Sequence, residues 1–249
     1  MTRAVRDFIF VLIISGRAFA SPATAEGAPP GFLYLRDIDP TIEQDLRYAG
    51  SDNFVGHPLP GYEAAECVLR VAAARALQAV QADLAQQGFG IKVYDCYRPA
   101  RAVGDMVTWA AEDAADPNDE RFFPRVSKRA LLRDGYIAKR STHSTGLAVD
   151  LTLVRRGESA KSGQPSGPCR GPVDDSLDMG TTFDCFDPMA QTVNSAVDNV
   201  ARQHRALLLA VMQRHGFSNY SREWWHFSYR DDHAAHVDFD FSIVPRPVR

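Results

Sequence analysis

The chain has 249 residues, 45% of them hydrophobic and 24% charged, and this composition excludes a disordered, fibrous or coiled-coil protein. Such a length provides a hydrophobic core for one domain, or at most two. With 28 basic and 31 acidic side chains the formal net charge is -3, and no long basic stripe is present, so we expect no nucleic-acid partner.

Residues 1–20 follow the plan of a secretory signal peptide. Arg3 and Arg6 precede an apolar run over residues 8–14, and Ala18-Phe19-Ala20 supplies small residues at the cleavage site. The run is shorter than the about 20 residues needed to span a bilayer, so no stable membrane anchor should remain after cleavage. A buried N-terminal helix is the alternative, but the pattern favours an exported protein, periplasmic or secreted.

We predict a single domain over residues 32–249, preceded by a loose, Pro-rich leader over residues 21–31. The first ordered residues are expected at 32–35. Hydrophobic side chains at helical spacing predict a helix over residues 64–87, which Gly88 would end.

Strand and helix signals then follow one another along the chain. Short, partly β-branched sequence predicts a buried strand at residues 91–95, and a helix is expected at 101–114. Residues 147–154 alternate as a strand does, with Asp150 on the face opposite the Val and Leu side chains. Residues 155–172 are rich in Gly, Ser and Pro, which predicts a long loop.

The last predicted elements are a helix over residues 200–215, ended by Gly216, and a strand over residues 224–229. Helices and short strands in this order favour an α+β fold with a small, mostly antiparallel sheet flanked by helices. No internal repeat is visible in the sequence.

The four cysteines form an even set, as expected for disulfides in an exported protein. Three pairings are possible. We favour Cys67 with Cys96, which a helix and the following strand could bring together, and Cys169 with Cys185, which would close a Gly/Pro-rich loop. The sequence has no CxxC motif, which argues against a thioredoxin-type redox site and a cysteine-based zinc site.

Three segments far apart in the sequence carry the side chains of a catalytic zinc site. His143 and Asp150 lie in one segment, and His226 offers a third ligand in another, with the carboxylate of Glu223 shortly before it. Zinc hydrolases commonly take three ligands from His and carboxylate side chains and leave the fourth position to water. Arg98 follows a predicted strand end, where it could stabilise the oxyanion formed when water attacks a carbonyl.

Each of these signals has a plainer interpretation when taken alone. A His near an Asp is more often a structural hydrogen-bonded pair, no HExxH motif is present, and Arg98 could form a surface ion pair. Glu223 and His226 would point to opposite faces of a strand unless Glu223 precedes the strand or lies at a bulge. The occurrence of all three segments in one exported domain favours the zinc site.

The motifs SxHxxGxAxD at residues 141–150, EWWHF at 223–227 and DxYRP at 95–99 resemble those of the zinc D-alanyl-D-alanine dipeptidases, relatives of the enzyme used in vancomycin resistance. The resemblance extends over nearly the whole chain after the leader, and includes further motifs at residues 48–56, 61–63 and 179–184. It implies the zinc-peptidase fold that is shared with D-Ala-D-Ala carboxypeptidases and the hedgehog signalling domain.

Carried onto this sequence, the resemblance implies one zinc ion bound by His143, Asp150 and His226. Glu223 would be the general base, and Arg98 would stabilise the transition state. The substrate would be a small molecule, the free dipeptide D-Ala-D-Ala, which is hydrolysed to two molecules of D-alanine.

The resemblance also places substrate-binding residues. The ammonium group of the dipeptide would meet Asp184, and Tyr48, Tyr62 and Ser141 would line a small pocket. A carboxylate facing the ammonium group would exclude longer, amide-capped peptides, since these would leave it unpaired. The chain departs from the family pattern in its signal peptide and in a longer loop before the segment that carries Asp184.

Two other functions stay open at this point. A peptidoglycan D,D- or L,D-carboxypeptidase or endopeptidase of the same superfamily would apply the same chemistry to polymer, although Asp184 favours a free dipeptide. A non-catalytic binding module that retains the fold and the zinc would need neither Glu223 nor Arg98.

Overall fold

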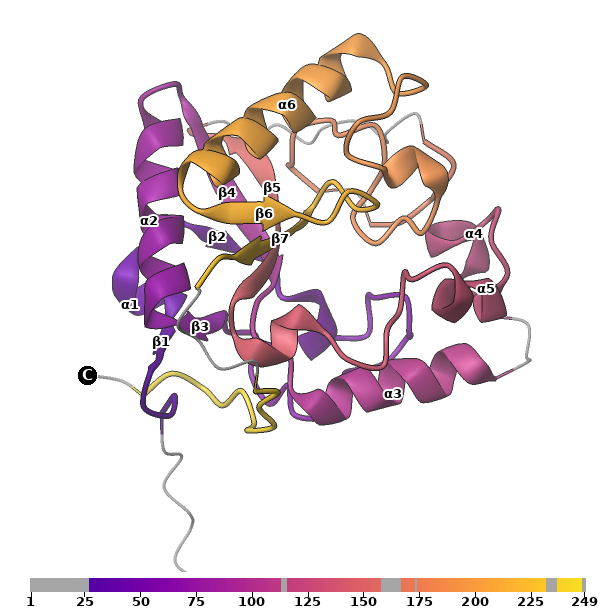
Figure 1. The fold of residues 1–249 in the computed structure, drawn as a ribbon, viewed down its shortest axis with the longest axis horizontal. Coiled ribbons are helices and arrows are strands. Elements are labelled where there is room, and N and C mark those ends of the chain that lie inside the picture. Colours follow the sequence, from indigo (N-terminus) through magenta and orange to yellow (C-terminus); the bar gives the residue numbers. More distant parts are fainter. Residues whose placement is uncertain (1–26, 113–115, 158–166, 173, 232–236, 248–249) are drawn as a thin grey trace, which may run out of the picture.

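The computed structural model describes residues 27–112, 116–157, 167–172, 174–231 and 237–247. These residues form the α+β domain that the sequence predicts (Figure 1). The predicted signal peptide at residues 1–20 and most of the predicted leader lie outside the described residues. In the described part of the chain, no helix is long and apolar enough to cross a membrane.

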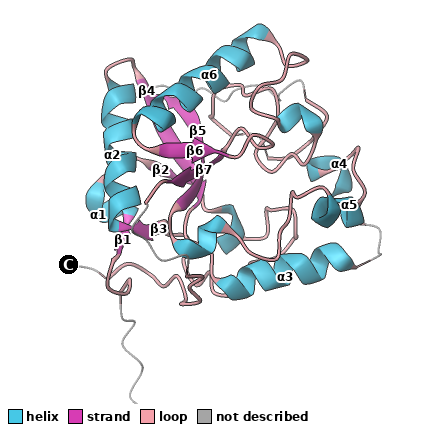
Figure 2. Cartoon of the chain, in the orientation of Figure 1, coloured by secondary structure: helices cyan, strands magenta, loops and turns pink. Residues whose placement is uncertain are grey.

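A five-stranded sheet lies at the centre of the domain (Figure 2). Its strands, in spatial order, are β2 (Glu43–Gln44), β4 (Phe89–Asp95), β5 (Ala148–Arg155), β7 (His226–Tyr229) and β6 (Phe217–Asn219). Within this sheet β2 and β4 are parallel and the other pairs are antiparallel, so the expected mostly antiparallel sheet is confirmed. A second, two-stranded sheet pairs β1 (Phe32–Tyr34) with β3 (Val68–Arg70).

Helices flank the five-stranded sheet. Two long helices, α2 (Val71–Ala85) and α6 (Asn199–Arg214), lie side by side and pack against it through buried apolar side chains (Figure 1). The shorter helix α1 (Leu35–Ile38) contacts α2. The remaining helices, which lie on the other side of the domain in Figure 1, are α3 (Ala100–Ala111), α4 (Asp119–Phe122) and α5 (Lys128–Arg133).

The predicted helix over residues 64–87 is wrong in its first part. The helix α2 begins at Val71, and the three preceding residues form β3. Val68 and Leu69 are buried in an antiparallel pairing with β1, which lies far earlier in the sequence. Because Val68 lies three and four positions before Val71 and Ala72, it also fits one face of a helix, and the local pattern does not reveal the distant partner strand.

The other predicted elements are present, with shifted ends. The strand expected at residues 224–229 begins at His226, and the helix expected at 101–114 ends at Ala111. The patterns do not predict β2, β6, α1, α4 or α5, because each is only two to six residues long. Elements of this length show too few side chains for a periodicity to be recognised.

Both favoured disulfides, Cys67–Cys96 and Cys169–Cys185, are confirmed. The first joins the residue before β3 to the residue after β4. The second joins the loop that follows β5 to the residue after Asp184. Cross-links of this kind restrict the unfolded chain, and they fix two loop ends next to the centre of the domain.

Candidate metal centre and active site

Three side chains converge beside the central strand β5. His143, Asp150 and His226 form a group that could hold a metal ion. Nε2 of His143 lies 3.1 Å from Nδ1 of His226, and Oδ1 of Asp150 lies 3.2 Å from the former and 3.0 Å from the latter. A tetrahedral ion with bonds of about 2.0–2.1 Å separates its ligand atoms by about 3.3 Å. The spacing of the three atoms therefore fits a single metal ion.

The backbone brings these three ligands together. Asp150 on β5 is the direct antiparallel partner of His226, the first residue of β7. His143 lies in a short 3-10 helix that ends at Gly146, just before β5. Gly146 has a φ of 74°, and a Cβ atom there would lie 2.2 Å from the ring of Phe32, so this turn requires glycine.

Each histidine is oriented through its second ring nitrogen. Nδ1 of His143 lies 2.6 Å from the carbonyl oxygen of Cys96. Since a carbonyl oxygen only accepts, Nδ1 carries the proton and Nε2 keeps the lone pair that a metal needs. Nε2 of His226 lies 3.2 Å from Oγ1 of Thr142, which leaves Nδ1 of His226 directed at the other ligands.

The charges of the three side chains suit a metal site. Burial alone would raise the pKa of Asp150, but His143 and His226 hold it below its usual range. Burial lowers the pKa of His226, which favours its neutral imidazole. The cluster thus offers a carboxylate and neutral imidazole, the forms that bind a divalent ion.

Arg98 lies beside the three-ligand cluster. Its Nε and Nη2 atoms each lie 2.9 Å from Oδ2 of Asp95, and Nη2 lies 3.6 Å from Oδ2 of Asp150. Asp95 is fully buried and accepts a 2.6 Å hydrogen bond from the hydroxyl of Tyr62. The guanidinium is therefore held from behind by a buried carboxylate, which fixes its direction.

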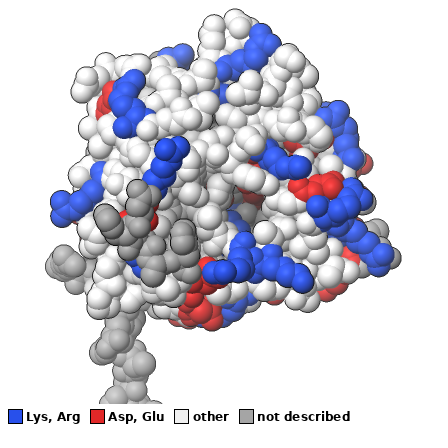
Figure 3. All heavy atoms as spheres, in the orientation of Figure 1, with Lys and Arg blue, Asp and Glu red and all other residues white. Residues whose placement is uncertain are grey.

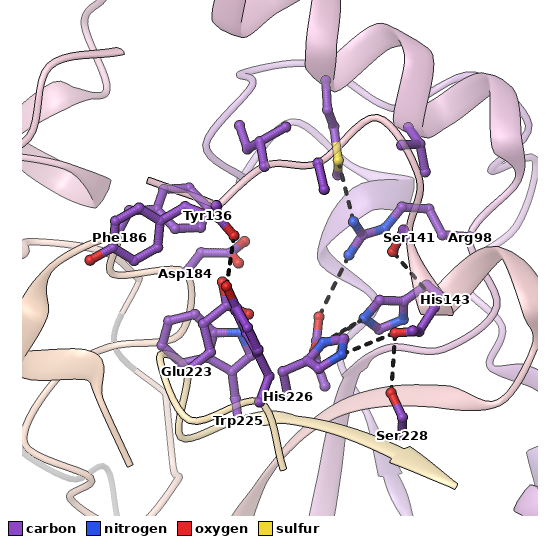
Figure 4. A pocket seen from close by; sticks show the side chains of 18 of the residues that line it. Arg98, Tyr136, Ser141, His143, Asp184, Phe186, Glu223, Trp225, His226 and Ser228 are labelled. Atoms are coloured by element: carbon purple, nitrogen blue, oxygen red, sulfur yellow. Dashed lines mark hydrogen bonds and ion pairs between the residues drawn. The ribbon is translucent and has the colours of Figure 1, made fainter. Parts of the chain in front are cut away.

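Two further carboxyl groups face the cluster from the side opposite Arg98 (Figure 4). Glu223 is buried in the turn before β7, so it precedes the strand that begins with His226. Asp184 is also buried and accepts a 2.9 Å hydrogen bond from the hydroxyl of Tyr48. Burial, followed by the charge of Asp150, raises the pKa of both carboxyl groups well above the usual range.

The three-ligand cluster, Arg98, Glu223 and Asp184 line one cavity of about 490 Å³. Small-molecule sites commonly have volumes of about 300–1,000 Å³. In the space-filling view the same face of the molecule is hollowed, with basic and acidic side chains near the opening (Figure 3). The apolar residues of the lining include Phe54, Val103, Met106, Ile137, Phe186 and Trp225.

Sequence comparison places the chain among known peptidases. The profile of a peptidase family described as D-ala-D-ala dipeptidase matches residues 29–245. The chain belongs to this family. Its motifs had indicated the same membership, which is thereby confirmed.

Three relatives of this family, each named D-alanyl-D-alanine dipeptidase, match over most of their length. The Enterococcus faecium protein is 32% identical over 213 residues, which are 86% of this chain and 98% of that protein. The Streptomyces coelicolor protein is 31% identical over 215 residues, with shares of 86% and 98%. The Escherichia coli protein is 32% identical over 194 residues, with shares of 78% and 81%.

In this member of the dipeptidase family, most of the predicted site residues lie around the cavity. Those that line it are His143, Asp150, His226, Glu223, Arg98, Asp184, Ser141 and Tyr48. Tyr62 is not part of the lining, and its hydroxyl is directed at Asp95 behind Arg98. Oγ of Ser141 accepts a 3.3 Å hydrogen bond from the backbone N–H of His143, so Ser141 also caps the turn that carries this ligand.

The groups that orient the candidate metal ligands of this family member could not be recognised from the sequence. The carbonyl oxygen of Cys96 has no sequence signature, because every residue carries the same backbone carbonyl group. Thr142 and Asp95 lie within the recognised motifs, and their place in these motifs is the only sequence signal that points to a role. Their contacts with His226 and Arg98 emerge only from the fold.

Proposed function

We propose that this protein hydrolyses the free dipeptide D-Ala-D-Ala to two molecules of D-alanine, with one zinc ion bound by His143, Asp150 and His226. The main observation in support is the cavity around these ligands, with the carboxyl of Glu223 on one side and the guanidinium of Arg98 on the other (Figure 4). A purely structural metal site has no use for this pair. Two imidazoles and one carboxylate also match a catalytic zinc site, which keeps an open fourth position.

Glu223 is the general base of the proposed reaction. When bound, zinc supplies a Lewis acid that polarises the amide carbonyl and lowers the pKa of water. Glu223 takes a proton from the attacking water and delivers it to the leaving amine. Its pKa, raised first by burial, suits a group that must hold this proton between the two steps.

Arg98 stabilises the negative charge that develops on the carbonyl oxygen. Asp95 holds its Nε and Nη2 atoms, while Nη1 donates to the sulfur of Met106 at 3.4 Å. A thioether is a weak acceptor, so this N–H group is available to a stronger one. A guanidinium that is already fixed needs little rearrangement as the charge forms.

Asp184 selects a substrate with a free amino terminus. Burial opposes an isolated charge on Asp184 and raises its pKa, and the ammonium group of a dipeptide would supply a counterion. An amide-capped peptide would leave the carboxyl without this partner, and a site built around such a contact can discriminate by a factor on the order of 10⁴. Asp184 therefore favours a dipeptidase over a carboxypeptidase or an endopeptidase.

The proposal predicts that hydrolysis is confined to the free D,D-dipeptide. Purified protein is offered D-Ala-D-Ala, L-Ala-L-Ala and N-acetyl-D-Ala-D-Ala, with and without a chelator, and the released alanine is measured. We expect cleavage of D-Ala-D-Ala alone, and loss of this activity when the chelator removes the metal. Cleavage of the acetylated compound would indicate a carboxypeptidase instead, and no cleavage of any of the three would indicate a binding module.

We further propose that the protein acts after export, in the periplasm or outside the cell. The signal-peptide pattern of residues 1–20 supports this location. The two disulfides also support it, since disulfides persist mainly in oxidising compartments.

Loss of the Cys169–Cys185 disulfide is expected to weaken substrate binding. Cys185 directly follows Asp184, whose φ of 58° is unusual for a residue other than glycine, so the cross-link lies next to a strained position. Replacing both cysteines by serine should raise KM for D-Ala-D-Ala several-fold and change kcat less. Steady-state kinetics of the double variant measure this effect.

The serine variant is a sharper test than a reducing agent. Reduction would also break Cys67–Cys96, and the carbonyl oxygen of Cys96 contacts the metal ligand His143. A double serine variant with the KM of the wild type would contradict a role for the second disulfide in binding.

A further inference from the structure

The cavity contains a second arginine that the proposed reaction does not use. Arg140 lines the cavity, its side chain is 71% exposed, and its Nε atom donates to Oδ2 of Asp238 at 2.7 Å. Within the described residues, Nη1 and Nη2 of Arg140 have no hydrogen-bond or ion-pair partner. Arg98, by contrast, is held against Asp95 through two of its nitrogens. Arg140 is therefore the cavity arginine whose terminal donors are free.

Arg140 lies in the segment of the cavity lining that also carries Ser141 and His143. It directly precedes Ser141, which begins the 3-10 helix that carries a metal ligand. In Figure 4, Ser141 lies on one side of His226, and Asp184 and Glu223 lie on the other. The residue that follows Arg140 and the two acidic groups therefore lie on opposite sides of His226, a member of the three-ligand cluster.

We propose that Arg140 binds the α-carboxylate of the dipeptide, an inference that rests on the proposed function. A free dipeptide is a zwitterion whose ammonium and carboxylate groups lie at opposite ends, with its single amide between them. With the ammonium group at Asp184 and the amide at the three-ligand cluster, the carboxylate is directed toward the segment that carries Arg140. Nη1 and Nη2 can donate hydrogen bonds to the two oxygens of a carboxylate in a bidentate arrangement.

The hydrogen bond to Asp238 supports this role. It engages only Nε of Arg140, which orients the guanidinium while its outer edge stays available. The segment of Asp238 is itself anchored beside the metal site, since the backbone N–H of Phe239 donates to the carbonyl of Ser144 at 2.8 Å. Arg140 is thus oriented by a carboxylate whose chain segment is hydrogen-bonded to the 3-10 helix of His143.

Arg140 and Asp184 would together recognise both ends of the substrate, with unequal strength. Asp184 is 3% exposed, so an unpaired charge there is costly, whereas water can replace a lost partner at the exposed Arg140. Selection for a free carboxylate is therefore expected to be weaker than selection for a free amino group. A hydrogen bond to a charged group corresponds to about tenfold in affinity at the lower end of its range.

The test compares Arg140→Gln with the wild type on D-Ala-D-Ala and on D-Ala-D-alaninamide, which lacks the carboxylate. The variant should lose about tenfold in kcat/KM for the dipeptide, mainly through KM, and nothing for the amide. Arg133→Gln is the matched control, because Arg133 is 74% exposed, also pairs through Nε, and does not line the cavity. Arg140→Lys keeps the positive charge but lacks the planar guanidinium group, so its KM for the dipeptide should lie between those of the wild type and Arg140→Gln.

A binding measurement makes the test independent of turnover. In the Glu223→Gln background, calorimetry gives a Kd for D-Ala-D-Ala, which Arg140→Gln should raise by a factor similar to that in KM. An unchanged Kd, or equal losses on the dipeptide and the amide, would overturn the assignment of Arg140. A wild-type protein that binds D-Ala-D-Ala without cleaving it would contradict the proposed function alone, and one that does not bind it would contradict both.

Discussion

Replacing Glu223 by glutamine is expected to lower kcat for D-Ala-D-Ala by about 10²- to 10⁴-fold, the usual contribution of a positioned general base. Glutamine preserves the shape of the side chain but does not take a proton from water. Because Glu223 is outside the three-ligand cluster, the zinc content should stay at one ion per chain. The variant should be no less stable than the wild type, since the carboxyl of Glu223 is buried near those of Asp150 and Asp184.

Kinetics, metal analysis and thermal unfolding of the same preparation check this result. Glu63→Gln is a suitable control, because Glu63 is exposed and does not line the cavity. Wild-type kcat in a Glu223→Gln protein that retains its zinc would refute the mechanism. Loss of the zinc would show instead that Glu223 acts as a ligand.

Replacing Arg98 by lysine is expected to lower kcat by about 10²- to 10³-fold, the range observed when one oxyanion donor is lost. Lysine keeps a positive charge near the buried Asp95. It lacks the planar guanidinium group, which in Arg98 binds the Asp95 carboxylate through Nε and Nη2. Arg98→Ala is a harsher change, because it leaves the buried carboxylate of Asp95 unpaired. Removing one partner of a buried ion pair typically costs about 3–5 kcal/mol of stability.

Comparison of the lysine and alanine variants separates catalysis from stability. We expect both to lose turnover, and the alanine variant alone to show a large fall in Tm. Arg101→Lys provides the control, since Arg101 pairs with Asp240 and does not line the cavity. Should Arg98→Lys turn over D-Ala-D-Ala at the wild-type rate, Arg98 would serve to hold Asp95 and would have no part in the transition state.

Elements with a long, regular pattern could be predicted from the sequence, whereas pairings between distant segments could not. The helix α6 and the strand β5 lie within a residue or two of their predicted positions. For β3 the local pattern is ambiguous, because Val68 continues the helical spacing of Val71 and Ala72 and suits a strand as well. Only the pairing with β1 decides between the two, and no local sequence signal reports it.

The residue types of the candidate site could be predicted, but not how they are supported. His143, Asp150 and His226 are chemically distinctive, and each lies in a recognisable motif. Tyr62 also lies in a motif, yet its hydroxyl is directed at a buried carboxylate and not at the cavity, which depends on the path of the backbone. Arg140 lies one position before its nearest motif, so only the cavity lining identifies it.

Cys96 links the covalent framework of the domain to the ligand cluster. Its sulfur is bonded to Cys67, and its carbonyl oxygen is the partner of Nδ1 of His143. The imidazole of His143 is therefore hydrogen-bonded to a backbone position that the disulfide cross-links. If the proposed zinc ion binds there, the folded chain is a preorganised tridentate chelator, and its ligand side chains lose little rotational freedom on binding. We therefore expect slow release of the proposed ion, since two of its ligands lie on paired strands and the third in the 3-10 helix just before β5.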